Sequence, residues 1–236
     1  MRRFYSPLAK SGIDIPLETE ESRHLRDVLR LSLGDEVAVF DGNGREFLAT
    51  IRSIGKKVAE LSVEGETTSA SPESPLNLTI APTIINGEKY DFIIQKSVEL
   101  GVTSLIPLIS KRCEVKQTDA VKRLDRWRRI ALEATKQCGR AKIMTVHEPV
   151  TFEEFIDSPS SIIMFSERDG MRLPDKIDHD ELTLIYGPKG GWDDDELQLA
   201  KNNNVMLVTF GGRILRAETA AIGITAVIQN RFGDMN

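Results

Sequence analysis

The sequence has few of the patterns that mark membrane, secreted or metal-binding proteins. No apolar run approaches the roughly 20 residues that a membrane-spanning helix needs, which excludes a membrane protein. The basic N-terminus is not followed by the apolar stretch of a secretory signal. Cys113 and Cys138 are too far apart for a CxxC spacing, and the three histidines are scattered along the chain: His24, His147 and His179. We therefore expect a cytoplasmic protein with reduced thiols and no structural metal.

An excess of positive charge is also missing. The formal net charge is -5, which fails the strongly basic test for a general nucleic-acid binder. Cations nevertheless gather in the first thirty residues and in one predicted helix: Arg2, Arg3, Lys10, Arg23, Arg26 and Arg30, then Lys122, Arg123, Arg126, Arg128 and Arg129. Such clusters are usually solvated faces. An RNA-contacting role for them needs a further observation that points to RNA.

The first part of the chain indicates a small β-rich unit. With 236 residues, the chain is long enough for two modest domains. Helical spacing of apolar residues predicts a helix over 19–31. Short alternating runs between residues 37 and 63 predict β-hairpins, one of them turning at Asp41-Gly42-Asn43-Gly44. Residues 65–75 are rich in Ser, Pro and Glu, which is typical of a linker. We predict two domains: 1–70 and 76–236.

The second part alternates strand-like and helical runs. The compact apolar runs are typical of buried parallel strands, and the amphipathic runs are typical of helices that cover a sheet. The predicted strands are 78–83, 104–109, 162–165, 182–186 and 205–209, and the predicted helices are 91–100, 120–137, 194–201 and 217–232. Trp127 falls on the apolar face of its helix, which favours a core position over base stacking. The alternation predicts a parallel α/β domain whose ligand site lies after the carboxyl ends of the strands.

Two glycine-rich loops directly follow predicted strands. The first is Gly187-Pro188-Lys189-Gly190-Gly191, and the second begins Phe210-Gly211-Gly212-Arg213. Glycine permits positive φ and lets a ligand approach the backbone. Neither loop matches GxGxxG or the phosphate-binding loop that ends in Gly-Lys-Ser/Thr, which disfavours a nucleotide-dependent oxidoreductase. Each loop taken alone is equally well explained as a tight turn, but two such loops together favour a ligand site.

These loops resemble those of the bacterial ribosomal RNA small subunit methyltransferase E family, which belongs to the SPOUT methyltransferases. The most specific piece is Gly-Gly-Arg-Ile-Leu-Arg-Ala-Glu-Thr-Ala, residues 211–220. The resemblance extends over essentially the whole chain, including His24-Leu25, the run from Gln95 to Gly101, and Glu133-Ala134 through Arg140. It implies a PUA-like N-terminal β-barrel domain and a C-terminal α/β domain with a trefoil knot, a feature that general topology rules would not predict. It also implies S-adenosylmethionine as cofactor, a homodimer, and methylation of uridine N3 in 16S ribosomal RNA of the small subunit.

The sequence departs from the family pattern at three positions. Lys189 replaces the usual glutamate of the Gly-Pro-Glu-Gly-Gly loop, Phe210 replaces a leucine, and Met144 replaces a frequent proline. The lysine inverts a charge beside the expected cofactor but keeps the glycines that shape the loop. We therefore expect that glutamate to be dispensable for the chemistry.

The resemblance, combined with the chemistry of uracil, identifies candidate catalytic residues. N3 becomes a good nucleophile only when its proton leaves and negative charge spreads to O2 and O4, and a guanidinium would stabilise that charge. Arg216 is our first candidate, against the alternative of a surface arginine paired with a carboxylate. Glu218 is either a general base or a residue favoured by the helix dipole. Thr219 either orients the base or satisfies backbone groups at the helix start.

Binding residues follow from the same resemblance. The cofactor pocket is expected to contain backbone groups of the two loops, apolar side chains, and Phe165 from an earlier strand: Phe165, Gly187, Pro188, Gly190, Gly191, Phe210, Gly211, Ile214 and Leu215. The target uridine must be unpaired or flipped outward, since N3 is occupied in a base pair. Candidate RNA contacts are Arg2, Arg3, Arg23, His24, Arg30 and Arg213. The main alternative function is a non-catalytic RNA-binding or ribosome-assembly factor.

Overall fold

The computed structural model describes residues 1–157, 161–177 and 180–235, so His179 lies outside the described residues. The chain divides into two compact units. Unit 1 consists of Met1–Glu73 together with Thr135–Ile143, and unit 2 consists of Ser74–Ala134 and Met144–Asn236. The segment from Thr135 to Ile143 lies within the predicted second domain, and no local pattern in it predicts packing with the first part of the chain.

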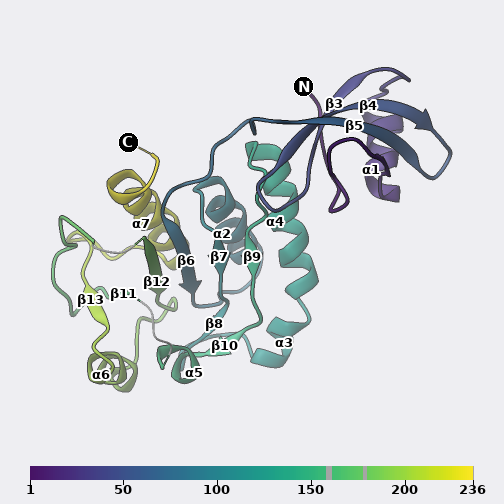
Figure 1. The fold of residues 1–236 in the computed structure, drawn as a ribbon. Helices are drawn as coiled ribbons and strands as arrows, with labels where there is room; N and C mark the ends of the chain where they lie inside the picture. The colour runs from purple at the N-terminus through teal and green to yellow at the C-terminus, as the bar shows by residue number, and fades with distance from the viewer. Residues whose placement is uncertain (158–160, 178–179, 236) are drawn as a thin grey trace. The chain divides into compact units, whose positions relative to one another are not determined.

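Unit 1 is built on one five-stranded sheet with the order β1-β3-β4-β5-β2 (Figure 1). Its strands are β1 (Arg3–Tyr5), β2 (Asp14–Pro16), β3 (Glu36–Phe40), β4 (Glu46–Ile54) and β5 (Ala59–Thr67). Strands β3, β4 and β5 form an antiparallel meander, and β1 adds to β3 in parallel. Alternate side chains of these strands, among them Phe4, Val39 and Phe47, fill the core of the unit. The predicted β-rich unit is therefore confirmed.

The turn between β3 and β4 is fixed by a carboxylate. Asp41 Oδ1 accepts hydrogen bonds from the backbone N–H groups of Asn43 (2.7 Å) and Arg45 (3.1 Å). Gly42 and Gly44 both have positive φ, 81° and 103°, which glycine adopts without steric cost. The Asp-Gly-Asn-Gly signal therefore predicted this turn correctly.

The predicted helix over 19–31 is shorter than expected. The α-helix α1 covers Thr19–Arg23 and continues as a π-helical turn, η1, over His24–Val28. There the Leu29 N–H donates to the carbonyl oxygen of His24, five residues earlier, at 3.0 Å. Arg30 then adopts a φ of 53°, which ends the helical path. Val28, an apolar residue of this turn, is 65% exposed.

Buried ion pairs hold the segment 135–143 within unit 1. The Arg3 guanidinium donates to Glu46 Oε2 (2.9 Å) and to the backbone oxygens of Lys136 (3.1 Å) and Arg140 (2.9 Å). The Arg140 guanidinium donates to Glu73 Oε2 at 2.6 Å, and only 3% of the Arg140 side chain is exposed. Because each of these charges is paired, their burial is tolerated.

Unit 2 contains a six-stranded parallel sheet with the order β13-β11-β12-β6-β7-β9 (Figure 1). Its strands are β6 (Asn77–Pro82), β7 (Ser104–Leu105), β9 (Thr145–Val146), β11 (Ile162–Phe165), β12 (Glu181–Tyr186) and β13 (Met206–Val208). A separate pair, β8 (Leu108–Ile109) with β10 (Val150–Thr151), is also parallel. The predicted α/β domain with a parallel sheet is confirmed, although the run 104–109 forms two short strands in place of one.

Helices cover both faces of this sheet. On one face lie α5 (Phe152–Ile156) and α6 (Asp194–Asn202), whose apolar side chains pack with Met164 and Ile185 of the sheet. On the other face α2 (Glu88–Glu99) packs against α7 (Ala217–Phe232). The run 120–137 forms two helices, α3 (Gln117–Val121) and α4 (Leu124–Cys138), and Trp127 of α4 is buried beside Tyr90 as predicted.

Within the described residues, no helix has the length and apolar character to cross a membrane. The same residues contain no group of three or more His, Cys, Asp or Glu side chains that could hold a metal ion.

Candidate functional site

The carboxyl ends of four neighbouring strands are aligned in unit 2. Val208 of β13 pairs with Phe165 of β11, which pairs with Tyr186 of β12, which in turn pairs with Pro82 of β6. The loops that follow β11, β12 and β13 therefore begin at the same edge of the sheet. In open α/β sheets ligands bind at this edge.

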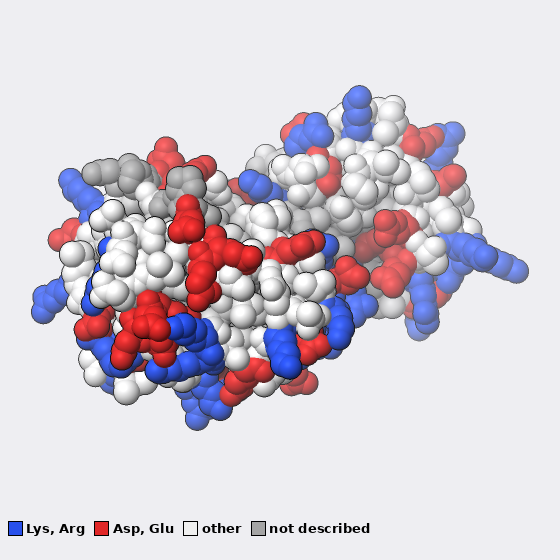
Figure 2. All heavy atoms as spheres, turned by 90° about the horizontal axis from the view of Figure 1, so that it is seen from below, with Lys and Arg blue, Asp and Glu red and all other residues white. Residues whose placement is uncertain are grey.

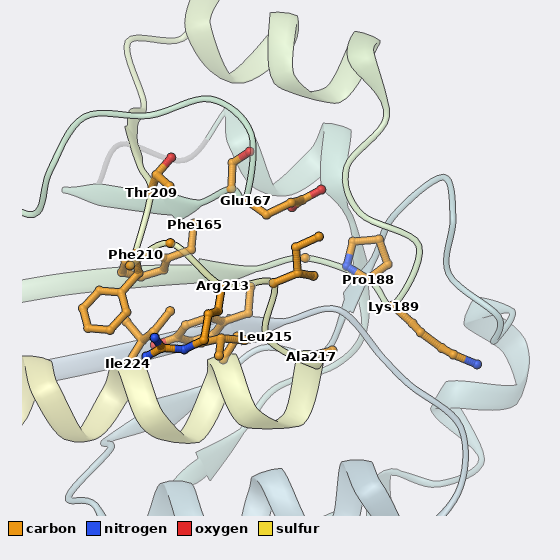
Figure 3. Close-up of a pocket in the computed structure, with 17 residues that line it drawn as sticks. Phe165, Glu167, Pro188, Lys189, Thr209, Phe210, Arg213, Leu215, Ala217 and Ile224 are labelled. Atoms are coloured by element: carbon orange, nitrogen blue, oxygen red, sulfur yellow. The ribbon is translucent and has the colours of Figure 1, made fainter.

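A cavity lies between these three loops and the first turns of α7 (Figure 3). It is lined by residues from the strand ends, both glycine loops and the helix: Phe165, Ser166, Glu167, Tyr186, Gly187, Pro188, Lys189, Thr209, Phe210, Gly211, Gly212, Arg213, Ile214, Leu215, Ala217, Ala220 and Ile224. Both glycine loops thus contribute to one cavity. We take this cavity as the candidate active site.

The loop after β12 is packed against an indole. A side chain on Gly187 would place its Cβ 2.9 Å from Trp192 Nε1, closer than real Cβ atoms normally approach. The Trp192 Nε1–H donates to the carbonyl oxygen of Phe165 at 2.8 Å, which fixes the ring across the end of β11. Gly191 has a φ of 72°, and its N–H donates to the Pro188 carbonyl oxygen at 3.0 Å. This loop is therefore a close-packed turn.

Two arginines from other loops donate hydrogen bonds to the same turn. The Arg112 guanidinium donates to the carbonyl oxygen of Gly190 (3.0 Å) and to Asp193 Oδ2 (3.2 Å). The Arg168 guanidinium donates to the carbonyl oxygen of Trp192 at 2.8 Å. The turn then enters α6 through a capping box, in which the Asp193 N–H donates to Glu196 Oε2 at 2.9 Å. Neither arginine could be identified from the sequence, because each acts on a loop distant along the chain.

Stacked aromatic rings form the inner wall of the cavity. Phe165 and Tyr186 lie with ring centroids 5.3 Å apart and planes 9° from parallel. The buried Tyr186 hydroxyl is hydrogen-bonded to Thr225 Oγ1 of α7 at 2.8 Å. Burial raises the pKa of the Tyr186 hydroxyl above its usual value, so this tyrosine stays neutral at physiological pH. The wall therefore offers an apolar, uncharged surface.

The loop after β13 is more open. Residues 211–216 are exposed, and Ile214 is 86% exposed. Gly211 has a φ of 71°, and a Cβ added to Gly211 or Gly212 would meet no atom within 4 Å. Helix α7 then presents Ala217, Ala220 and Ile224 to the cavity. Their spacing of three and four residues is helical, and this periodicity is the signal that would have identified them in the sequence.

A buried hydroxyl in the cavity wall is left unpaired. Thr209 Oγ1 is buried and has no hydrogen-bond partner among the described residues, and Thr209 lines the cavity. Buried polar groups are nearly always hydrogen-bonded in folded proteins. This hydroxyl packs toward Gly170, where an added Cβ would lie 2.9 Å from Thr209 Oγ1.

The three predicted catalytic residues lie at the start of α7. Arg216 is the N-cap residue of this helix, and Glu218 and Thr219 belong to its first turn. They do not belong to the described residues that line the cavity, although their neighbour Ala217 does. Glu218 Oε1 accepts a hydrogen bond from Lys89 Nζ at 2.7 Å. This hydrogen bond and ion pair hold the pKa of the Glu218 carboxyl below its usual value, which makes the carboxylate a weaker base.

Most of the predicted cofactor residues surround the cavity. Seven of the nine line it: Phe165, Gly187, Pro188, Phe210, Gly211, Ile214 and Leu215. Gly190 and Gly191 belong to the same turn but not to the cavity wall, and the Gly190 carbonyl oxygen is held by Arg112. Sequence reasoning missed four polar or aromatic wall residues: Ser166, Glu167, Tyr186 and Thr209.

The predicted RNA contacts fall in both units. Arg2, Arg23 and Arg30 of unit 1 are exposed, and His24 is half-buried. Arg3 differs, because its donors bind Glu46 and two backbone oxygens, which gives it a structural role. Arg213 lines the cavity. On the face in Figure 2, the positive and negative side chains of the described residues are interspersed.

Comparison with known proteins supplies a class for this fold and site. Residues 72–229 match the family model of an RNA methyltransferase domain, and residues 17–64 match that of an RNA methyltransferase PUA domain. The parallel sheet with its cavity is therefore an RNA methyltransferase domain, and the β-rich unit contains a PUA domain.

Sequence and structure comparisons narrow this class further. The chain is 32% identical to Ribosomal RNA small subunit methyltransferase E of Rickettsia conorii, over 89% of this chain and 85% of that protein. The crystal structure of a Ribosomal RNA small subunit methyltransferase E from Neisseria gonorrhoeae, bound to S-adenosylmethionine, superposes with a TM-score of 0.91 at 37% identity, covering both chains completely. A Legionella pneumophila methyltransferase structure with bound SAM covers 98% of each chain at 32% identity, with a TM-score of 0.88. The chain belongs to the ribosomal RNA small subunit methyltransferase E family.

Proposed function

We propose that this chain transfers a methyl group from S-adenosylmethionine to N3 of a specific uridine in 16S ribosomal RNA. The observation that carries the proposal is the single cavity that both glycine loops form at the carboxyl ends of β11, β12 and β13. The Neisseria and Legionella structures, which resemble this chain over nearly their full length, each hold the cofactor. We also infer that the chain acts in the cytoplasm, where ribosomes assemble.

The cavity suits an adenosine with a polar amino-acid tail. The stacked Phe165 and Tyr186 rings, with Leu215 and Ile224, would provide apolar contacts. Backbone groups of the two loops would hold the remaining polar atoms. The bound cofactor supplies an electrophilic methyl group, and the protein positions the acceptor base.

Activation of the uracil depends on charge at the loop after β13. As the N3 proton passes to solvent water, negative charge develops on O2 and O4, and fixed positive charge would stabilise it in the transition state. Arg216 stands at the N-terminus of α7, where the free backbone N–H groups add partial positive charge. We assign Arg216 to stabilise the developing anion. Arg213, which lies closer to the cofactor cavity, contacts the RNA.

The contacts of Glu218 and the position of Thr219 favour positioning roles. The ion pair between Glu218 and Lys89 joins the start of α7 to α2, and it lowers the basicity that a general base needs. Thr219 lies in the first turn of the helix, where backbone N–H groups lack intrahelical partners. Both residues therefore fix the direction in which α7 begins, and through it the position of Arg216.

The remaining parts of the proposal concern RNA and assembly. Arg2, Arg23, His24 and Arg30 of unit 1 contact phosphates and position an unpaired uridine, and Arg3 is left out because its donors are used internally. By family resemblance, the C-terminal domain carries a trefoil knot and the chain forms a homodimer. Sedimentation analysis of the purified chain tests the dimer, and a single monomeric species would contradict it.

Methyl transfer is tested directly with labelled S-adenosylmethionine and small ribosomal subunits that lack their own uridine N3 methyl group. After digestion, mass spectrometry identifies the labelled nucleoside. Label on N3 of uridine supports the proposal, and label on another nucleoside would overturn the target. Binding of the cofactor without transfer to any RNA would favour the alternative of a non-catalytic RNA-binding or ribosome-assembly factor.

A further inference from the structure

One acidic side chain lines the candidate cofactor cavity. Among the described residues that form its wall, Glu167 is the only carboxylate. It follows the end of β11 by two residues, and Figure 3 shows it beside the strand ends, on the opposite side of the cavity from α7. The two cationic residues of the wall, Lys189 and Arg213, belong to the other two loops. Glu167 therefore gives the cavity a negative charge at one defined place.

The position of this carboxylate depends on a glycine in the neighbouring loop. A Cβ added to Gly191 would lie 2.6 Å from Glu167 Oε1, so the carboxylate occupies the space that a side chain at Gly191 would fill. Gly191 also has a φ of 72°, which other residues rarely adopt. The close packing of the loop after β12 thus places the Glu167 carboxylate at the cavity wall.

The protein itself satisfies this carboxylate only weakly. Its one ion pair among the described residues is with the adjacent Arg168, at 3.6 Å, beyond hydrogen-bond distance. Arg168 uses its Nη2 to donate to the Trp192 carbonyl oxygen and also lies 3.6 Å from Asp194. About a third of the Glu167 side chain is exposed, which leaves its oxygens available to a ligand.

We propose that the Glu167 carboxylate recognises a cationic group of S-adenosylmethionine. This inference rests on the proposed function. The cofactor has two cationic groups, the sulfonium and the amino group of its methionine part, and a carboxylate in a partly desolvated wall attracts either. Pairing with the sulfonium would also favour the cofactor over its demethylated product, whose sulfur is neutral, and so would help product release.

Equilibrium binding to the full chain separates these groups. Isothermal titration calorimetry is carried out with three ligands: S-adenosylmethionine, S-adenosylhomocysteine, which lacks the sulfonium charge, and methylthioadenosine, which lacks both cationic groups. Glu167→Gln keeps the shape of the side chain and removes its charge. We expect this substitution to weaken S-adenosylmethionine binding about ten- to a hundredfold, as loss of a charged hydrogen bond does, and to leave methylthioadenosine binding nearly unchanged. If Glu167→Gln weakens S-adenosylhomocysteine binding as much as S-adenosylmethionine binding, the partner of the carboxylate is the amino group. If S-adenosylhomocysteine binding is not weakened, the partner is the sulfonium.

Glu148→Gln provides the matched control, because Glu148 is exposed and does not line the cavity. Equal weakening of all three ligands by Glu167→Gln would overturn the inference, since it would indicate a contact with the shared ribose or a misshapen pocket. Unchanged binding of all three would also overturn it, while the proposed function would stand. Failure of the unsubstituted chain to bind S-adenosylmethionine would instead overturn the proposed function and this inference with it.

Discussion

The two glycine loops of the cavity are similar in composition but differ in how closely other parts of the domain pack against them. The loop after β12 packs on the Trp192 indole, is held by Arg112 and Arg168, and continues into a capped helix. The loop after β13 is exposed from residue 211 to 216, and its adjacent glycines have open space around their Cα atoms. One loop is a fixed wall, and the other is a solvent-facing segment that carries two arginines.

The difference shows that glycine has a different purpose in each loop. At Gly187 the absence of a side chain permits close contact with an aromatic ring, so its role is packing. At Gly211 it permits a φ of 71°, so its role is the direction of the backbone. We infer that both loops form the cofactor pocket and that the open loop, through its arginines, also serves the RNA substrate and the chemistry.

Arg216→Ala should separate these roles most strongly. If the open loop supplies the charge that stabilises the uracil anion, this substitution lowers turnover by about a hundredfold or more, as loss of a transition-state hydrogen-bond donor does. The free energy of unfolding and the affinity for the cofactor should stay unchanged, because the Arg216 side chain is exposed and does not line the cavity. Single-turnover methylation of small subunits measures the effect.

Arg213→Ala is the matched comparison on the same loop. We expect it to raise the KM for RNA with a smaller effect on kcat, in keeping with an RNA contact. Unchanged turnover in Arg216→Ala, or a larger loss of kcat in Arg213→Ala, would move the catalytic role away from Arg216.

The sequence predicted these loops but not the side chains that hold one of them in place. Glycines directly after predicted strands indicated the site, and Phe165, Gly187 and Leu215 do line the cavity. Arg112 follows β8 and Arg168 follows β11, so their contacts with the loop after β12 depend on the order of strands in the sheet. Local patterns contain no information about such contacts.

A pair of glycine substitutions tests the packing difference. Gly187→Ala forces a methyl group against a buried indole, and we expect it to lower the free energy of unfolding by about 1 to 3 kcal/mol. Gly212→Ala should change it by less than about 0.5 kcal/mol, because its Cβ would meet open space. Urea unfolding followed by tryptophan fluorescence measures both. Equal destabilisation by the two substitutions would contradict the distinction between the loops.

Arg112→Ala tests whether the hydrogen bond between Arg112 and the loop after β12 affects cofactor binding. Losing the hydrogen bond to the Gly190 carbonyl oxygen should loosen the fixed loop and raise the Kd for S-adenosylmethionine by about fivefold, corresponding to about 1 kcal/mol. Lys111→Ala is the control, since Lys111 pairs with Asp193 and Asp195 without contacting Gly190. A similar loss of affinity in both variants would assign the effect to general surface charge.

The positions of most helices and strands were predicted correctly, whereas one helix end and the extent of the first unit were not. Buried runs such as Ile162–Phe165 and the helix Ala217–Phe232 were located correctly, because apolar periodicity reports burial directly. The π-helical turn at His24–Val28 and the packing of 135–143 with unit 1 were missed. The packing of 135–143 depends on tertiary contacts, among them the pairing of Arg140 with Glu73, residues that lie far apart in the sequence.

Glu218→Gln has the smallest expected effect and concerns the helix that follows the open loop. Lys89 holds the pKa of the Glu218 carboxyl below its unfolded value, so the pair stabilises the fold above that value, and this contribution disappears as the pH falls through the lowered pKa. The wild-type chain should be more stable than the variant by a few tenths of a kcal/mol near neutral pH, since Lys89 is half-exposed, and the difference should disappear once the pH has fallen below the lowered pKa of Glu218. Thermal unfolding from pH 3 to 7 measures it.

Turnover of Glu218→Gln should change little, whereas loss of a general base would lower turnover about a hundredfold or more. A large loss of turnover with unchanged RNA binding would return Glu218 to the role of proton acceptor and make the start of α7, in place of the open loop alone, the centre of the chemistry.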